Sequence, residues 1–175
     1  EQRNAADRIL AAAGLDPQAD VTRDNLSVAE SVAAMKDKKI DAFFWIGGLP
    51  TGAVTDLVST PNLAVTFIDT SEFVGPLREK YGPVYTAFDL PQATYAGLTS
   101  DIPGIGIGNI LFVNASMPVA LAHDLLSTIF ANLDEVKQIH PEAMNLSVES
   151  SPVGSSIPFH PGAIQFYVEQ GTWPE

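Results

Sequence analysis

The segment 26–51 constrains the fold of this chain most strongly, because it encodes a helix, an apolar run and a tight turn in succession. Ser27 and Glu30 stand three residues apart, a capping box that predicts a helix beginning at Ser27. The run 40–46 is apolar almost throughout, which is typical of a strand covered on both faces in a parallel sheet. A Gly-Gly pair ends the run at 47–48, and a Pro-Thr pair then opens another helix. Because ligands of open α/β sheets lie beyond the carboxyl ends of the strands, we expect a binding site at this turn.

Apolar runs and amphipathic segments alternate along the rest of the chain. We predict strands over Val21–Leu26, Ile40–Ile46, Leu63–Ile68 and Ile105–Val113. Helices are predicted at the N-terminus as far as Gly14 and then over 27–39, 51–59, 73–81, 118–133 and 161–170. Residues 85–97 are predicted to be extended but irregular, and 147–158 to form a loop. Alternation of this kind indicates an α/β fold whose sheet is at least partly parallel.

Composition narrows the classes of function. The 175 residues include 21 acidic against nine basic side chains, a net charge of −12, which argues against binding to nucleic acid or to an anionic membrane surface. The longest apolar stretch, 102–113, is too short to cross a bilayer, which takes about 20 residues. The absence of cysteine excludes disulfides and thiolate metal sites. A chain of this length is expected to bury a core of its own.

Several short motifs, in a fixed order, resemble one family. They are AESVAAMKDKKIDAFFWIGGLPT at 29–51, PQATYAG at 91–97, IGNILFV at 107–113, FANLD at 130–134 and IPFHPGA at 157–163. Together they resemble the TAXI-type solute-binding receptors of TRAP transporters. The resemblance implies a type II periplasmic-binding-protein-like α/β fold, in which two lobes close around a cleft. It also implies that this chain is the C-terminal portion of such a receptor, with the first lobe largely missing.

By the same resemblance, residues 1–97 form the second ligand-binding lobe, truncated at its N-terminus. Residues 98–175 form a returning strand and C-terminal helices that would pack against the first lobe and the hinge. The expected function is that of a bacterial periplasmic receptor without enzymatic activity, from which the signal peptide has been removed. It would capture a small carboxylate or amino acid such as glutamate and hand it to the membrane subunits of a TRAP transporter. No cofactor and no metal are expected.

Six residues of the turn and of the PQATYAG motif are predicted to bind the ligand: Trp45, Gly47, Gly48, Leu49, Thr51 and Tyr95. Backbone N–H groups at a helix start, with a hydroxyl beside them, suit an anion or a polar ligand edge. The alternative is that the glycines only make a tight turn. The Tyr95 hydroxyl either faces the cleft or packs beneath the hinge, and the pattern leaves both interpretations open. In many amino-acid-binding relatives of the wider fold an aspartate ends this strand; by register from Asp41 that place is Ile46 here, so the ammonium of an amino-acid ligand would be held elsewhere.

A different class of function is a small α/β enzyme, or a regulatory ligand-binding domain, that uses the Gly-Gly turn as an anion site. An enzyme needs a nucleophile, a base or a metal near that turn, and the sequence offers none. His123, His140 and His160 lack metal-ligand spacing, and the last two precede prolines, which favours positions at helix boundaries. The glycines at 104–108 lack the spacing of a dinucleotide loop and favour a strand that passes close to another backbone.

Overall fold

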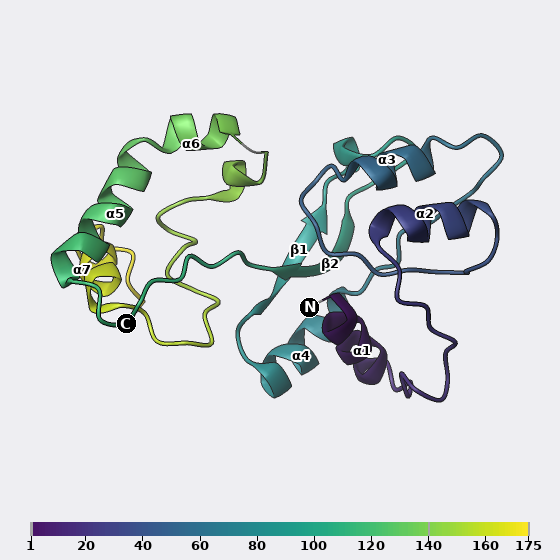
Figure 1. Cartoon of the computed structure of the whole chain (residues 1–175), viewed down its shortest axis with the longest axis horizontal. Helices are drawn as coiled ribbons and strands as arrows, with labels where there is room; N and C mark the ends of the chain where they lie inside the picture. The colour runs from purple at the N-terminus through teal and green to yellow at the C-terminus, as the bar shows by residue number, and fades with distance from the viewer. Residues whose placement is uncertain (1, 140, 175) are drawn as a thin grey trace. The chain divides into compact units, whose positions relative to one another are not determined.

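The computed structural model describes residues 2–139 and 141–174 (Figure 1). Its α-helices are α1 Gln2–Ala12, α2 Val28–Lys36, α3 Gly52–Val58, α4 Val74–Tyr81, α5 Val119–Ala131, α6 Leu133–Ile139 and α7 Pro161–Glu169. Short 3₁₀ turns lie at Ser71–Phe73, Gln92–Thr94 and Pro141–Asn145. Two strands, β1 Tyr85–Leu90 and β2 Ile102–Ile107, pair in a two-stranded sheet. The fold is therefore mixed α/β and mostly helical.

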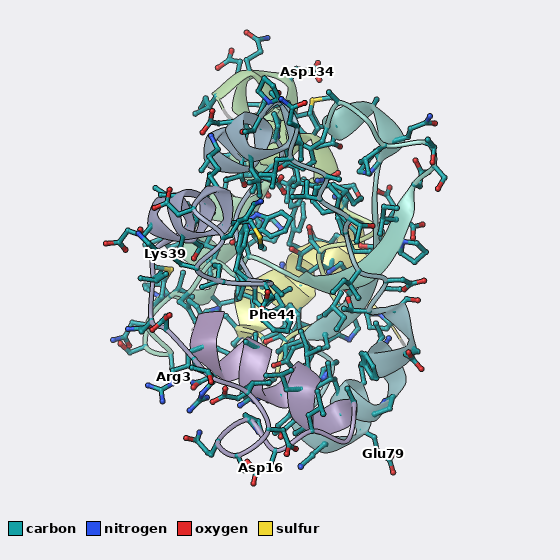
Figure 2. All side chains as sticks on the ribbon, turned by 90° about the vertical axis from the view of Figure 1, so that its right-hand side faces the viewer. Arg3, Asp16, Lys39, Phe44, Glu79 and Asp134 are labelled. Atoms are coloured by element: carbon teal, nitrogen blue, oxygen red, sulfur yellow. The ribbon has the colours of Figure 1, made fainter. Side chains whose placement is uncertain are left out.

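The chain divides into two compact units. Residues 1–80 and 87–106 form the first unit, and residues 81–86 and 107–175 form the second. The first unit contains the whole turn at 45–51 together with Tyr95, so the predicted site lies within one unit. The labelled charged side chains Arg3, Asp16 and Glu79 of this unit project outward in Figure 2, as solvated charges should.

Helix α2 begins as its capping box predicts. The Glu30 amide donates to Ser27 Oγ at 3.3 Å, and Glu30 Oε2 accepts from the Ser27 amide at 2.8 Å. A hydrogen bond from the Ser27 backbone, and then one from the Ser27 side chain, lowers the pKa of the Glu30 carboxyl. Lys36 Nζ lies 2.6 Å from Asp56 Oδ2 and ties α2 to α3, which lie side by side in Figure 1. The two helices that flank the turn in sequence are thus in direct contact.

The core of the first unit forms beneath α3. Val54 of α3 is 1 % exposed and packs with Leu90 at the end of β1 and with Tyr95. Partly buried side chains surround this trio: Val28, Trp45, Leu49, Val58, Phe67, Leu98 and Ile102. The core therefore draws on α2, on the turn, on α3 and on both strands, which fixes the turn against the sheet.

Three of the four predicted strands are wrong. Within the described residues, 21–26, 40–46 and 63–68 form no ladder, and only the start of the predicted strand 105–113 belongs to β2. Residues 85–90, predicted to be extended but irregular, form the regular strand β1. An apolar pattern specifies which side chains are buried, but a strand also needs a partner whose N–H and C=O groups match its own. The predicted partly parallel sheet of several strands is consequently not formed here.

Burial along the two apolar runs still follows the sequence in part. In residues 63–68 it alternates: the side chains of Leu63, Val65 and Phe67 are half-buried, and those of Ala64, Thr66 and Ile68 are exposed. The run 40–46 is not covered on both faces, since Ile46 is 49 % exposed. The period-two pattern thus sets the side-chain directions of 63–68 without a ladder.

The second unit is built on the packing of α5 against α7. His160 caps α7: its Nδ1 accepts from the Gly162 amide at 3.1 Å, and its Nε2 lies 3.0 Å from the Met117 carbonyl oxygen. Phe166 of α7 stacks on Phe130 of α5, with 5.4 Å between ring centroids. The predicted helix over 118–133 ends early, because Asn132 terminates α5 and its carbonyl accepts the first bonds of α6. The boundary role predicted for His160 is confirmed, and His140 lies outside the described residues.

Candidate functional site

The hydrogen bonds of the predicted site meet at Thr51. It stands at the N-cap position of α3, directly after the cis peptide bond between Leu49 and Pro50. Its hydroxyl donates to the Gly48 carbonyl oxygen at 2.8 Å and accepts from the Trp45 indole Nε1–H at 3.2 Å. The side chain therefore closes the turn instead of capping the helix.

Tyr95 joins this turn from far along the chain. The Thr51 amide donates to the Tyr95 hydroxyl oxygen at 2.8 Å, across 44 positions of sequence. The Tyr95 ring is only 3 % exposed and stacks on Phe67 at 5.6 Å between centroids, with 13° between the planes. Of the two interpretations of Tyr95, the structure shows a packed ring with its hydroxyl on the turn.

Aromatic rings line the inner side of the turn. Trp45 lies 6.0 Å from Phe67 and 6.2 Å from Phe43, measured between ring centroids. Phe67 thus contacts both Trp45 and Tyr95, a role that sequence analysis missed. The alternation within 63–68 placed Phe67 on a buried face, but nothing in the sequence showed which rings it would meet.

Small residues are needed where the turn is tightest. A Cβ atom on Gly47 would lie 3.3 Å from Thr51 Oγ1 and 3.6 Å from Trp45 Cδ1. Leu49 packs against the core of the first unit. The six predicted residues are therefore brought together, but the Thr51 amide and hydroxyl, expected to hold a ligand, are bonded within the turn. Ligand binding by these residues stays a prediction.

A cavity of about 310 Å³ borders Phe67. Uncharged residues line it: Val58, Leu63, Ala64, Val65, Thr66, Phe67, Ala96, Gly97, Leu98, Thr99 and Ile102. None of the six predicted site residues is among them. The cavity thus borders the core on which the turn packs, through Phe67, Leu98 and Ile102, but contains none of the predicted site residues.

Comparison with known protein families identifies the family to which this chain belongs. The model of the NMT1-like family matches residues 2–171, nearly the whole chain. The chain belongs to the NMT1-like family. This family is periplasmic-binding-protein-like and related to the TAXI receptors, and its members are typically binding proteins rather than enzymes. The resemblance inferred from the motifs is confirmed at this coarser level.

Over residues 2–139 and 141–174, no cluster of three or more His, Asp or Glu side chains is arranged to hold a metal ion. Nor does any helix in that part of the chain have the length and apolarity needed to cross a bilayer.

His123 forms a hydrogen-bonded contact between α5 and α7 in this NMT1-like protein. Its Nε2 lies 2.8 Å from Glu169 Oε2, its Nδ1 lies 3.4 Å from Asp124 Oδ1, and its side chain is 21 % exposed. Hydrogen bonds to Glu169 and then to Asp124 raise the pKa of His123. Bonds from Gln165 and then from His123 lower the pKa of Glu169. The pair is a structural contact of the second unit and lies away from the turn in sequence and unit.

The pH dependence of the second unit should report this pair. Because the pKa of His123 is raised on folding, the pair stabilises fully below about pH 6.5, the ordinary histidine pKa, and this stabilisation is lost as pH rises through the folded value. We expect His123→Gln to remove that part of the decline in stability as the pH rises above about 6.5. Thermal melts followed by Trp173 fluorescence measure it. Equal pH slopes in wild type and variant would contradict the assignment.

Proposed function

We propose that this NMT1-like protein is an extracytoplasmic solute-binding receptor of the TRAP type that captures a small carboxylate such as glutamate. Membership of a periplasmic-binding-protein-like family supports the receptor class. The observation that carries the site is the bond between the Thr51 amide and the Tyr95 hydroxyl, which joins two motifs of the proposed binding surface. Handing the solute to membrane subunits of a transporter is part of the same proposal.

The direction of the hydrogen bonds indicates how a carboxylate would bind. The Trp45 indole donates to Thr51, the Thr51 hydroxyl donates to Gly48, and the Thr51 amide donates to Tyr95. Since the Tyr95 oxygen accepts, its own hydrogen is left as a donor, with no acceptor among the residues that the structure describes. A carboxylate oxygen is a suitable acceptor for it. Ile46 offers no charge to an ammonium group, so the carboxylate is the end that this turn would recognise.

Affinity in this chain alone should be low. One hydrogen bond contributes about 1 kcal/mol net, and the amide dipoles of the turn add on the order of 1 kcal/mol. Even millimolar binding requires about −4 kcal/mol, and micromolar capture about −8 kcal/mol. The net charge of −12 gives an anion no attraction at long range. Tight enclosure of a small solute takes walls on both sides, as in a closed cleft.

Titration with glutamate tests this proposal. We expect the Trp45 indole N–H and the Thr51 amide to shift saturably in nuclear magnetic resonance spectra, with a Kd at or above the millimolar range. The Trp173 indole, in the other unit, is the internal control and should not shift. The diamide of glutamate, matched in size but without carboxylates, should have no effect. Micromolar affinity would contradict the expectation that the site is incomplete in this chain. Unshifted Trp45 and Thr51 signals would show that glutamate does not bind at the turn.

The enzyme alternative has no observation in its favour. The turn brings together an indole, a threonine, glycines and a tyrosine, and no nucleophile with a base beside it. The receptor function is therefore the one that the turn and the family support best.

A further inference from the structure

Three segments meet at the turn, and none of them carries a charged side chain. They are residues 42–55, which contain the turn, residues 57–68, which contain Phe67, and residues 90–100, which contain Tyr95. The chain has 21 acidic and nine basic side chains, so its charges are placed outside this region. A solute with a carboxylate and an ammonium group therefore meets no side chain of opposite charge in these segments, and its cationic end needs a different kind of partner.

Aromatic rings attract cations, and four rings follow one another beside the turn. Phe43, Trp45, Phe67 and Tyr95 lie at successive centroid distances of 6.2, 6.0 and 5.6 Å. Phe67 and Tyr95 are stacked, with 13° between their planes, so each covers a face of the other. Phe43 and Trp45 are tilted by 51° and are only half-buried, so they do not cover each other in this way. The face of an aromatic ring carries the negative part of its quadrupole.

We propose that the ammonium group of the solute binds on the faces of Trp45 and Phe43, and that the solute is a small betaine, a carboxylate with a fully methylated ammonium. This inference rests on the proposed receptor function and narrows its solute. An ammonium with N–H groups needs several hydrogen-bond acceptors, as the three donors of a lysine do. A fully methylated ammonium has no hydrogen to donate, and aromatic faces are the groups that recognise it.

The turn matches both ends of such a solute. The Tyr95 hydroxyl, which has a hydrogen to donate to a carboxylate, accepts from the Thr51 amide, and the Thr51 hydroxyl accepts from the indole N–H of Trp45. A single residue thus joins the donor for the carboxylate to the ring for the cation, so a small solute can span them. A betaine has no net charge, and the net charge of −12 does not repel it as it repels glutamate.

Trimethylglycine and its carbon analogue test the proposal. The analogue, the tert-butylacetate ion, has the same shape and the same carboxylate, but a carbon atom replaces the nitrogen and removes the positive charge. Each is titrated into the full chain and followed by the Thr51 amide and the Trp45 indole N–H, with the Trp173 indole of the other unit as control. We expect trimethylglycine to bind at least about fivefold more tightly, which corresponds to about 1 kcal/mol.

The methyl protons of bound trimethylglycine should also shift upfield, as protons above a ring face do. Equal affinity for the two compounds, or tighter binding of the analogue, would overturn the cation site. Carboxylate binding by the analogue or by glutamate would then leave the receptor proposal standing. No response of Thr51 and Trp45 to trimethylglycine, its analogue or glutamate would overturn both proposals.

Variants of Phe43 locate the ammonium. Phe43→Leu removes a ring face and keeps an apolar side chain, whereas Phe43→Tyr keeps the ring. We expect the preference for trimethylglycine over its analogue to fall at least about twofold in the leucine variant and to persist in the tyrosine variant. Asp41→Asn is the control, because this exposed carboxylate lies two residues from Phe43, and it should leave the preference unchanged. A preference that survives in Phe43→Leu, or is lost in Asp41→Asn, would overturn binding of the ammonium by the rings.

Discussion

Replacing Gly162 by alanine is expected to lower the free energy of unfolding of the second unit by about 3 kcal/mol, the upper end of the usual range for overpacking. A Cβ at this position would lie within van der Waals overlap of the Val119 carbonyl oxygen, and 3.0 Å from both Ala122 Cβ and the His123 amide nitrogen. These are backbone and near-backbone atoms of α5, so the helix itself must move. Alanine's higher helix propensity offsets about 1 kcal/mol at most.

The measurement uses the two tryptophans, one in each unit. In urea unfolding, the fluorescence of Trp173 reports on the second unit and that of Trp45 on the first. Each signal is measured in a protein whose other tryptophan is replaced by phenylalanine. Gly75→Ala in α4 is the matched control, because a Cβ there meets no atom within 4 Å. It should be neutral or stabilising by up to about 1 kcal/mol. If Gly162→Ala behaved like Gly75→Ala, the close approach of α5 and α7 would be wrong.

The helices were the most predictable part of this fold, because the residues that begin and end a helix lie close together in the sequence. The capping box of α2 and the proline at the start of α7 act within one turn of chain. Gly14, where the first predicted helix ends, and Gly82 and Gly171, which directly follow two other predicted helices, adopt positive φ. The break between α5 and α6 was missed, because apolar spacing continues across Asn132 and only its cap geometry separates the helices.

Strands were less predictable, since a ladder depends on a partner distant in sequence. Residues 63–68 carry the right alternation and show it in their burial, yet no partner lies beside them in the described chain. Residues 85–90 pair with β2 although a proline follows at once. The same reason applies to the site. The motifs predicted that Thr51 and Tyr95 share one surface, but the stacking of Phe67 on Tyr95 and its tilted contact with Trp45 could be seen only in the structure.

Replacing Tyr95 by alanine should lower the free energy of unfolding of the first unit by about 4 kcal/mol, within the range for deleting a buried aromatic ring. The ring is almost fully buried, stacks on Phe67 and packs with Val54 and Leu90. Its loss also leaves the Thr51 amide without its acceptor. Urea unfolding followed by Trp45 measures the change. Phe88→Ala is the control, because Phe88 belongs to the same unit but is 38 % exposed and should lose clearly less.

Tyr95→Phe separates the hydroxyl from the ring. It keeps the stacking and removes only the acceptor of the Thr51 N–H, so a loss of about 1–2 kcal/mol is expected. Unchanged stability would contradict the hydrogen bond between Thr51 and Tyr95. The Thr51 amide and the Tyr95 hydroxyl would then both be available to a ligand. A loss of stability together with a lost response to glutamate would mean that one hydroxyl both closes the turn and donates to the solute. That dual role follows from the bond direction, because the oxygen that accepts from Thr51 still carries a hydrogen to give.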